Sequence, residues 1–123
     1  AQNIIKELPE SAILFRLKTN DHLIKYYLEN GETEKANLKI EDIKLFIFHQ
    51  ASSIVLNTIR DKLKIPKEKF YHDIESFGNT VSSTIPIALI NADKEKRIPK
   101  KEPILIMGFG VGYSLSGGIF IFD

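Results

Sequence analysis

Cysteine is absent from the 123 residues of this chain. Disulfide bonds, thiolate metal ligands and a cysteine nucleophile are therefore excluded within it. Tryptophan is also absent, and Met107 is the single methionine. Neither sign of charge dominates, with 17 basic and 16 acidic residues, so no long-range field favours binding to nucleic acid or to an anionic membrane. We therefore expect neither of these as a partner.

Long apolar runs are also lacking. The apolar stretches, such as Leu45 to Phe48 and Ile104 to Met107, are only as long as a strand, whereas a membrane span needs about 20 apolar residues. No charged and then apolar leader precedes the first helical pattern, so we expect no secretory signal, no membrane insertion and a cytoplasmic location. With 43% hydrophobic and 27% charged residues, the chain has the composition of a single soluble domain.

The spacing of apolar residues predicts an α/β domain with the element order α-β-α-β-α-β-β. The predicted helices cover Pro9 to about Asn30, about Gln50 to Pro66, and about Ser83 to Lys94. The predicted strands cover Ile43 to His49, Phe70 to Ile74, Ile104 to Phe109 and Gly117 to Phe122, with Gly110 to Ser116 joining the last two as a hairpin. Ala51, Val55, Ile59 and Leu63 form the expected apolar stripe of the second helix. Residues 1–39 are expected to form a helical segment and loop, and residues 40–123 the main domain.

Two of the predicted strands, around Leu45 to Phe48 and Ile104 to Phe109, are apolar on both faces. Both of their faces then need covering, and the pattern offers about three helices for this. One interpretation is that another protein layer covers one face. The other is that the chain buries these residues by itself, and the sequence does not decide between them.

His49 stands out among the three histidines because it ends a predicted buried strand and precedes a helix. Open α/β sheets bind their ligands at this position, and a helix N-terminus disfavours the charged imidazolium. A neutral imidazole there can donate a hydrogen bond to a developing oxyanion. A buried structural histidine is the alternative. The histidines are too far apart in sequence to predict a metal site.

Asn79 occupies a similar position between the next predicted strand and helix. Gly78-Asn79-Thr80 can also be a simple turn in which Thr80 or Ser83 caps the helix. Taken together, His49 and Asn79 place two neutral donors on one rim of the sheet, which suggests an oxyanion site. The glycine-rich run Gly108 to Gly112 is not a dinucleotide-binding loop, because a strand and not a helix follows it.

Four motifs in sequence order resemble one known family. They are His49-Gln50-Ala51, Leu63 to Lys69, Gly78-Asn79-Thr80 with Ser83 to Pro86, and Gly108 to Gly112. From about Ile40 to Phe122 the chain resembles the C-terminal half of β-ketoacyl-acyl-carrier-protein synthase III, a thiolase-like condensing enzyme. The resemblance implies half of a thiolase-like fold, with a mixed sheet on the scale of five strands, and a missing N-terminal half that shares a helix layer with it.

The resemblance also implies a decarboxylative Claisen condensation in fatty acid or related biosynthesis. In the family, a cysteine of the N-terminal half takes an acyl group from acyl-CoA, and malonyl-acyl carrier protein loses carbon dioxide and attacks it. The resemblance assigns His49 and Asn79 to the malonyl thioester carbonyl and Phe109 to the space beside them. It assigns Gly110 and the amide of Val111 to the acyl oxyanion hole. This chain, without cysteine, is then inactive alone.

Two departures from the family pattern bear on the binding of the acyl carrier protein. Ser52 replaces the usual asparagine and Ile54 replaces a basic residue that helps to dock the carrier protein. Ser52 and Lys62, the latter with Lys64 and Lys67, are our candidates for substrate or carrier contacts. The expected partners are acyl-CoA, malonyl-acyl carrier protein, the N-terminal half and a second copy in a homodimer, with no cofactor and no metal. The alternatives are a cysteine-free partner subunit, a thiolase-like synthase that uses other acyl-CoA units, and a structural module.

Overall fold

The computed structural model describes residues 38–110 and 114–123. These residues form a four-stranded sheet in the order β2-β1-β3-β4. The strands are β1 (Leu45–Phe48), β2 (Phe70–Tyr71), β3 (Pro103–Gly110) and β4 (Ser114–Ile121). Strand β1 is parallel to both β2 and β3, whereas β4 is antiparallel to β3. The sheet is therefore mixed, as predicted, and its described part has the four strands of the predicted element order, one fewer than the five-strand scale that the resemblance implies.

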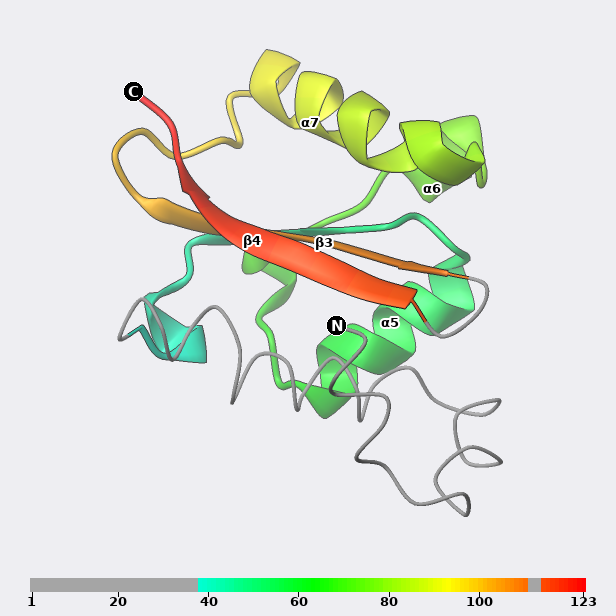
Figure 1. Cartoon of the computed structure of the whole chain (residues 1–123), viewed down its shortest axis with the longest axis horizontal. Helices are drawn as coiled ribbons and strands as arrows, with labels where there is room; N and C mark the ends of the chain where they lie inside the picture. The colour runs from blue at the N-terminus through cyan, green and yellow to red at the C-terminus, as the bar shows by residue number, and fades with distance from the viewer. Residues whose placement is uncertain (1–37, 111–113) are drawn as a thin grey trace.

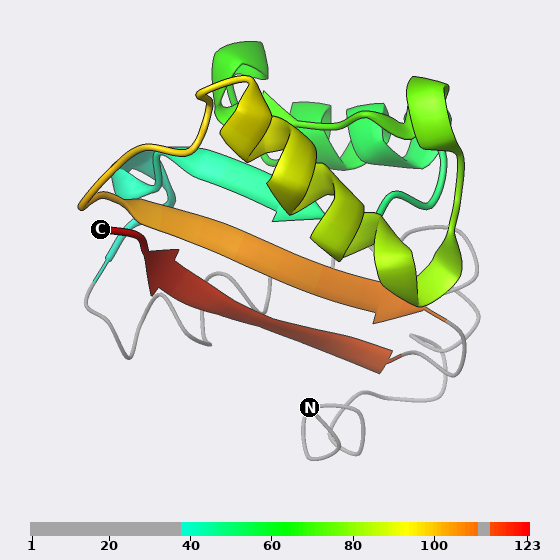
Figure 2. The ribbon, with the colours of Figure 1, turned by 90° about the horizontal axis from the view of Figure 1, so that it is seen from above.

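The helices lie on both sides of this sheet. Helix α5 (Ser53–Lys62) covers one face, and α6 (Ile74–Phe77) and α7 (Thr84–Lys94) lie over the other (Figures 1 and 2). Helix α5 leads from β1 outward to β2, and α7 leads back past β1 to β3. Because right-handed crossovers in opposite directions place their helices on opposite faces, this strand order gives three layers.

Side chains alternate between the two faces of the sheet with the period of two that strands impose. Phe46 and Phe48 join Leu105 and Met107 in a cluster with α5. Leu45, Ile47 and Ile104 join Ala88 and Ala92 of α7 in the other cluster. All four residues of β1 are buried, so helices of this chain cover both faces of its central strand. Another protein layer, which the sequence left open, is not needed to bury β1.

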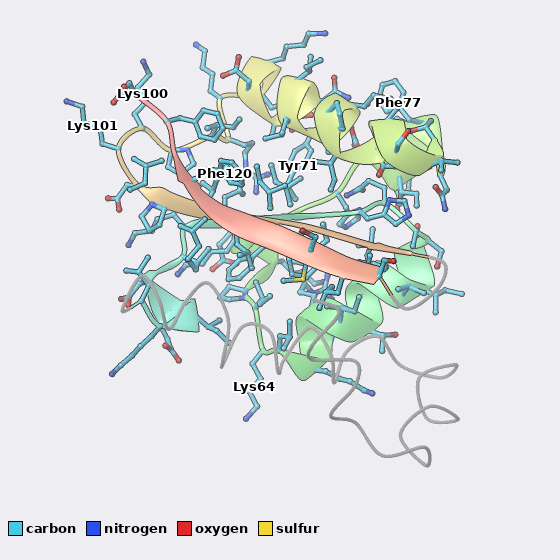
Figure 3. All side chains as sticks on the ribbon, in the orientation of Figure 1. Lys64, Tyr71, Phe77, Lys100, Lys101 and Phe120 are labelled. Carbon is cyan, nitrogen blue, oxygen red and sulfur yellow. The ribbon has the colours of Figure 1, made fainter. Side chains whose placement is uncertain are left out.

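Tyr71 attaches β2 to the C-terminal end of α7. Its hydroxyl donates a hydrogen bond to Glu95 Oε1 at 3.0 Å, and the Arg97 guanidinium lies 5.8 Å from the ring centroid. Figure 3 shows Tyr71 between the sheet and α7. Burial, together with the nearby Glu95 carboxylate, raises the pKa of Tyr71. The phenol therefore stays protonated and continues to donate this bond throughout the physiological pH range.

The start of α5 and its apolar stripe differ from the prediction. The helix begins at Ser53 because Ser52, in extended backbone, accepts a hydrogen bond from the Val55 N–H at 3.2 Å. Val55 is 37% exposed, and Leu56 is fully buried in its place. The predicted stripe is therefore wrong at Val55 and correct at Ile59 and Leu63, which lie in the cluster beneath the sheet.

The predicted strand from Phe70 to Ile74 is wrong in its second half. Strand β2 ends at Tyr71, and Ile74 begins α6. Ile74 is buried in the α5-side cluster, and a buried residue in one short helical turn gives the same sequence signal as a strand residue. The C-terminal hairpin is confirmed, but β4 begins at Ser114 and not at Gly117, so the connection is shorter than predicted. The helix predicted from Pro9 to Asn30 lies outside the described residues.

Candidate functional site

The side chain of His49 lies where the order of the sheet reverses. The chain leaves β1 toward β2 on one side, while β3 flanks β1 on the other. The connections that leave two adjacent parallel strands run in opposite directions at such a point, and open α/β sheets bind ligands in the crevice between them. His49 follows β1 directly, and its backbone N–H continues the ladder to the Met107 carbonyl at 2.8 Å. The candidate site is therefore at the carboxyl end of β1 and β3.

Two side chains hold the His49 ring. Its Nδ1 lies 2.7 Å from the hydroxyl of Thr84, the first residue of α7. The Phe109 ring packs against it edge to face, with centroids 5.4 Å apart and planes at 82°. Both contacts come from segments far from His49 in sequence, so the fold and not the local chain sets the orientation of the imidazole.

Burial lowers the pKa of His49 from its ordinary value of 6.5. The neutral imidazole is therefore the main form near neutral pH. The sequence argument expects this direction, although burial and not a helix end is the cause. A neutral ring can donate a hydrogen bond from one nitrogen while the other nitrogen accepts one.

Asn79 follows α6, and its amide is held at both ends. Its Oδ1 accepts the Val81 N–H at 2.9 Å, and its Nδ2 donates to the Ala51 carbonyl at 3.4 Å. Because Ala51 lies two residues after His49, this contact brings the Asn79 loop against the loop that carries the histidine. An amide nitrogen has two N–H groups, and the bond to Ala51 uses one of them. The side chain is exposed.

Buried Gln50 connects the loop that carries His49 to the segment before α6. Its Nε2 donates to the Phe48 carbonyl at 2.6 Å, and its Oε1 accepts the Asp73 N–H at 3.1 Å. Asp73 in turn accepts a hydrogen bond from Asn91 of α7 at 2.7 Å. The end of β1, the start of α6 and the middle of α7 are thus linked by one polar chain, so His49 and the segment leading to Asn79 are anchored together.

Phe109, Gly110 and Val111 are the residues predicted to lie beside the His49 and Asn79 pair. Phe109 contacts its ring, as described. Gly110 ends β3 and is exposed, and a Cβ at this position meets no atom within 4 Å. Val111 lies outside the described residues. The structure therefore places Phe109 in the site and gives no position for the Val111 amide.

The two candidates for carrier contact lie at opposite ends of α5. Ser52 is the N-cap of the helix, and Lys62 is its last residue. From Ile54 to Lys62 the helix rises by about 12 Å. Lys62 therefore lies at the other end of α5 from Ile54, and Ser52 caps the helix; contacts of either residue with substrate or carrier stay predictions.

Sequence reasoning gave no role to the side chains of Thr84 and Gln50. A threonine near a helix start usually indicates a cap, but the Ser83 N-cap of α7 has no side-chain capping bond, and Thr84 instead contacts His49, 35 positions earlier. The sequence pattern predicts Gln50 at a helix start, whereas the structure buries its side chain and bonds it to Asp73, 23 positions later. No feature of the neighbouring sequence indicates either of these long-range contacts.

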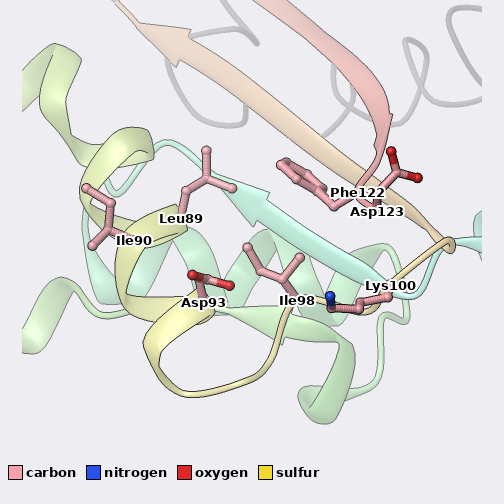
Figure 4. Close-up of a pocket in the computed structure, with 7 residues that line it drawn as sticks. All are labelled: Leu89, Ile90, Asp93, Ile98, Lys100, Phe122 and Asp123. Carbon is pink, nitrogen blue, oxygen red and sulfur yellow. The ribbon is translucent and has the colours of Figure 1, made fainter.

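Among the described residues, no group of three or more histidine, cysteine, aspartate or glutamate side chains could hold a metal ion. None of the described helices has the length and apolar character to cross a bilayer. A separate open hollow lies between α7 and the C-terminus, and Figure 4 shows its seven lining residues. These are Leu89, Ile90, Asp93, Ile98, Lys100, Phe122 and Asp123. None of them contacts His49 or Asn79 in the hydrogen bonds described above.

Comparison with known families gives a match over residues 33–121, to the C-terminal region of 3-oxoacyl-[acyl-carrier-protein] synthase III. This match covers well over half of the chain. The chain belongs to this family. A curated relative, the β-ketoacyl-[acyl-carrier-protein] synthase III of Aquifex aeolicus (strain VF5), is 43% identical over 79 residues. The aligned part is 64% of this chain and 26% of that relative.

Solved structures of synthase III enzymes share the fold of this chain. The enzyme from Thermus thermophilus matches with a TM-score of 0.73 and 32% identity, over 80% of this chain and 30% of that one. The Aquifex aeolicus VF5 enzyme matches with a TM-score of 0.70 and 33% identity, over 91% of this chain and 35% of that one. This synthase III domain thus corresponds to roughly a quarter to a third of the length of these relatives.

Proposed function

We propose that this domain supplies the histidine and asparagine of a decarboxylating condensing enzyme. The single observation that carries the proposal is the position of His49, a neutral ring fixed by Thr84 and Phe109 at the carboxyl end of two parallel strands. The membership of the synthase III family supports the same reaction class. The substrate class is a malonyl thioester on acyl carrier protein, with an acyl-CoA as the second reactant.

In this reaction, the bond between the malonyl carboxylate and its neighbouring carbon breaks, and carbon dioxide leaves. The electron pair left behind delocalises onto the thioester carbonyl oxygen as an enolate. His49 donates to this oxygen from Nε2, and Asn79 donates from Nδ2. Donors aimed in advance at a developing oxyanion stabilise the transition state more than the ground state. The enolate carbon then attacks an acyl thioester, and the thiolate departs.

The nucleophilic cysteine must come from outside these 123 residues, because the chain contains none. We propose that it belongs to an N-terminal half with the same general fold, as the greater length of the relatives suggests. We also propose that the complete enzyme is a homodimer and acts in fatty acid or related biosynthesis. The roles of Gly110, Val111, Ser52 and Lys62 remain predictions.

Replacing His49 or Asn79 by alanine in the complete enzyme tests the proposal. We expect each change to slow the decarboxylation of malonyl thioester by about 100- to 1,000-fold, because each removes one oxyanion donor. Radioactive carbon dioxide released from carboxyl-labelled malonyl thioester gives the rate without requiring condensation. Acyl transfer from acyl-CoA to the enzyme should continue, because it uses a different donor set.

Asn57→Ala is a matched control for the asparagine change. Asn57 lies on α5, where its side chain accepts a hydrogen bond from Arg60 at 2.7 Å, so decarboxylation should be unaffected. Unchanged decarboxylation in both His49→Ala and Asn79→Ala would contradict the proposed function and favour a non-catalytic subunit.

A further inference from the structure

The Thr84 hydroxyl has one proton to donate, and two atoms lie within hydrogen-bond distance of its oxygen. The side chain is 2% exposed, and its oxygen lies 2.7 Å from His49 Nδ1 and 3.1 Å from the Val81 carbonyl oxygen. A hydroxyl has one O–H donor and two acceptor lone pairs. Its proton therefore points to His49 or to Val81. This choice decides which nitrogen of the neutral His49 ring carries the imidazole proton.

The distances favour the histidine. Hydroxyl donors lie about 2.7–2.8 Å from their acceptors in most cases, and separations above about 3.0 Å fall outside the usual range for an O–H···O bond. The distance of 2.7 Å to Nδ1 fits a hydroxyl donor, whereas 3.1 Å to the Val81 oxygen is long for one. An N–H donor on Nδ1 would most often lie about 2.9–3.0 Å from the hydroxyl oxygen, within a range of about 2.7–3.2 Å, so 2.7 Å is at the short limit for that arrangement.

The Val81 carbonyl also has another donor. The backbone N–H of Thr84 bonds to this oxygen and closes the short helical turn η3 (Val81–Ser83). The hydroxyl proton is therefore not required to satisfy the carbonyl. The alternative, with the imidazole proton on Nδ1, would instead direct the hydroxyl proton to a carbonyl that already accepts a hydrogen bond and lies at the longer distance.

We propose that Thr84 is a positioning residue that donates to His49 Nδ1 and so fixes the neutral imidazole with its proton on Nε2. Thr84 then selects the tautomer, while the edge-to-face contact with Phe109 sets the plane of the ring. The functional consequence rests on the proposed condensing activity, in which Nε2 donates to the enolate oxygen. In the opposite tautomer, Nε2 presents a lone pair to that oxygen and repels the developing charge.

Nitrogen NMR of the ¹⁵N-histidine-labelled 123-residue chain tests the tautomer directly. The signals of His49 are those lost in His49→Gln. At a pH well above 7, we expect the wild-type ring to show a protonated Nε2 and an unprotonated Nδ1. A wild-type ring protonated on Nδ1 would overturn the inference, and this result needs no variant at Thr84.

Variants at Thr84 distinguish selection of the His49 tautomer from a role of Thr84 in packing alone. Valine has nearly the shape of threonine but no hydroxyl, so Thr84→Val should lower the ratio of the Nε2–H to the Nδ1–H form by roughly threefold to tenfold, the range of one net hydrogen bond. Thr84→Ser keeps the donor and should restore the ratio. Thr58→Val is the matched control, since the Thr58 hydroxyl bonds only to the Ile54 carbonyl on α5 in the described contacts. An unchanged ratio in Thr84→Val would overturn the inference.

Measurements of activity distinguish a failure of this inference from a failure of the proposed function. In the complete enzyme, Thr84→Val should lower kcat for malonyl decarboxylation by roughly threefold to tenfold with little change in KM, and Thr84→Ser should recover it. If His49→Ala leaves decarboxylation intact while the tautomer responds to Thr84, the proposed function fails and the Thr84 assignment stands. If His49→Ala abolishes decarboxylation but the wild-type proton is on Nδ1, only the Thr84 assignment fails.

Discussion

At the scale of single residues, His49 links the chemistry of the site to the stability of the fold. Burial lowers its pKa in the folded chain, whereas in the unfolded chain the ring titrates near 6.5. Below that pH the unfolded state binds more protons than the folded state, so protonation favours unfolding. The stability that His49 contributes is present above about pH 6.5 and is lost as the pH falls toward the lowered pKa of the folded state.

We therefore predict that the free energy of unfolding decreases as the pH falls below about 6.5, and that His49→Gln reduces this slope because glutamine does not titrate. Urea denaturation of both proteins at a series of pH values measures the difference. Each curve is referenced to its own value at about pH 8, which removes the constant effect of the substitution. Parallel curves for the two proteins would contradict the prediction.

The residue scale also shows what the sequence can reveal about the site. His49 and Asn79 could be identified because each follows a predicted strand, a position that has meaning in an open α/β sheet. Thr84 could not, because its partner lies 35 residues earlier and a threonine at a helix start has an ordinary local explanation. The missing information was the packing of α7 against the end of β1, which depends on the whole fold.

At the scale of elements, α5 and α7 end in the same way. Lys64 and Lys96 have φ values of 54° and 56°, in the left-handed region that favours glycine. After α5, the Ile65 N–H bonds to the Arg60 carbonyl and the Lys64 N–H to that of Asp61. After α7, Arg97 and Lys96 bond in the same pattern to Ala92 and Asp93. Both ends are Schellman motifs without the glycine usually found there.

We predict that Lys64→Gly and Lys96→Gly each raise the free energy of unfolding by about 0.5–1 kcal/mol, because glycine adopts this conformation without a Cβ clash. Chemical denaturation measures the change. Lys94→Gly is the matched control, since this exposed lysine is the last helical residue of α7 and its replacement should lower stability, by up to about 1 kcal/mol. A similar loss in all three variants would show that the left-handed conformation is not strained.

The sequence prediction is wrong about the end of one strand, β2, and about the buried face of one helix, α5. The pattern identified β1 and β3 because their residues are apolar without interruption, as in strands buried on both faces. It extended β2 to Ile74 because burial, and not strand geometry, makes that residue apolar. It chose Val55 over Leu56 because either residue fits a helical stripe, and only the crossing of α5 over the sheet determines which one is buried.

At the scale of the whole molecule, the sheet is well covered at its centre and less so at one edge. In the described part of the chain, β4 has β3 as its only strand neighbour. The C-terminal residues Phe120, Ile121 and Phe122 are exposed large apolar side chains on or next to this strand. An exposed apolar edge strand is a ready template for pairing with another chain. The chain spans about a quarter of its curated relatives' length, so more protein surface is available to cover this edge in a complete enzyme.

We predict that the 123-residue chain associates with itself through this edge. Sedimentation velocity over a range of concentrations should show a mass that rises above that of the monomer. Ile121→Lys places a charge at a position that is 63% exposed on β4 and should shift the chain toward the monomer, because charged side chains on an edge oppose strand pairing. Ile54→Lys is the same substitution at a position that is 80% exposed on α5, and should leave association unchanged. A wild-type chain that stays monomeric at every concentration, or equal effects of the two substitutions, would refute association through β4.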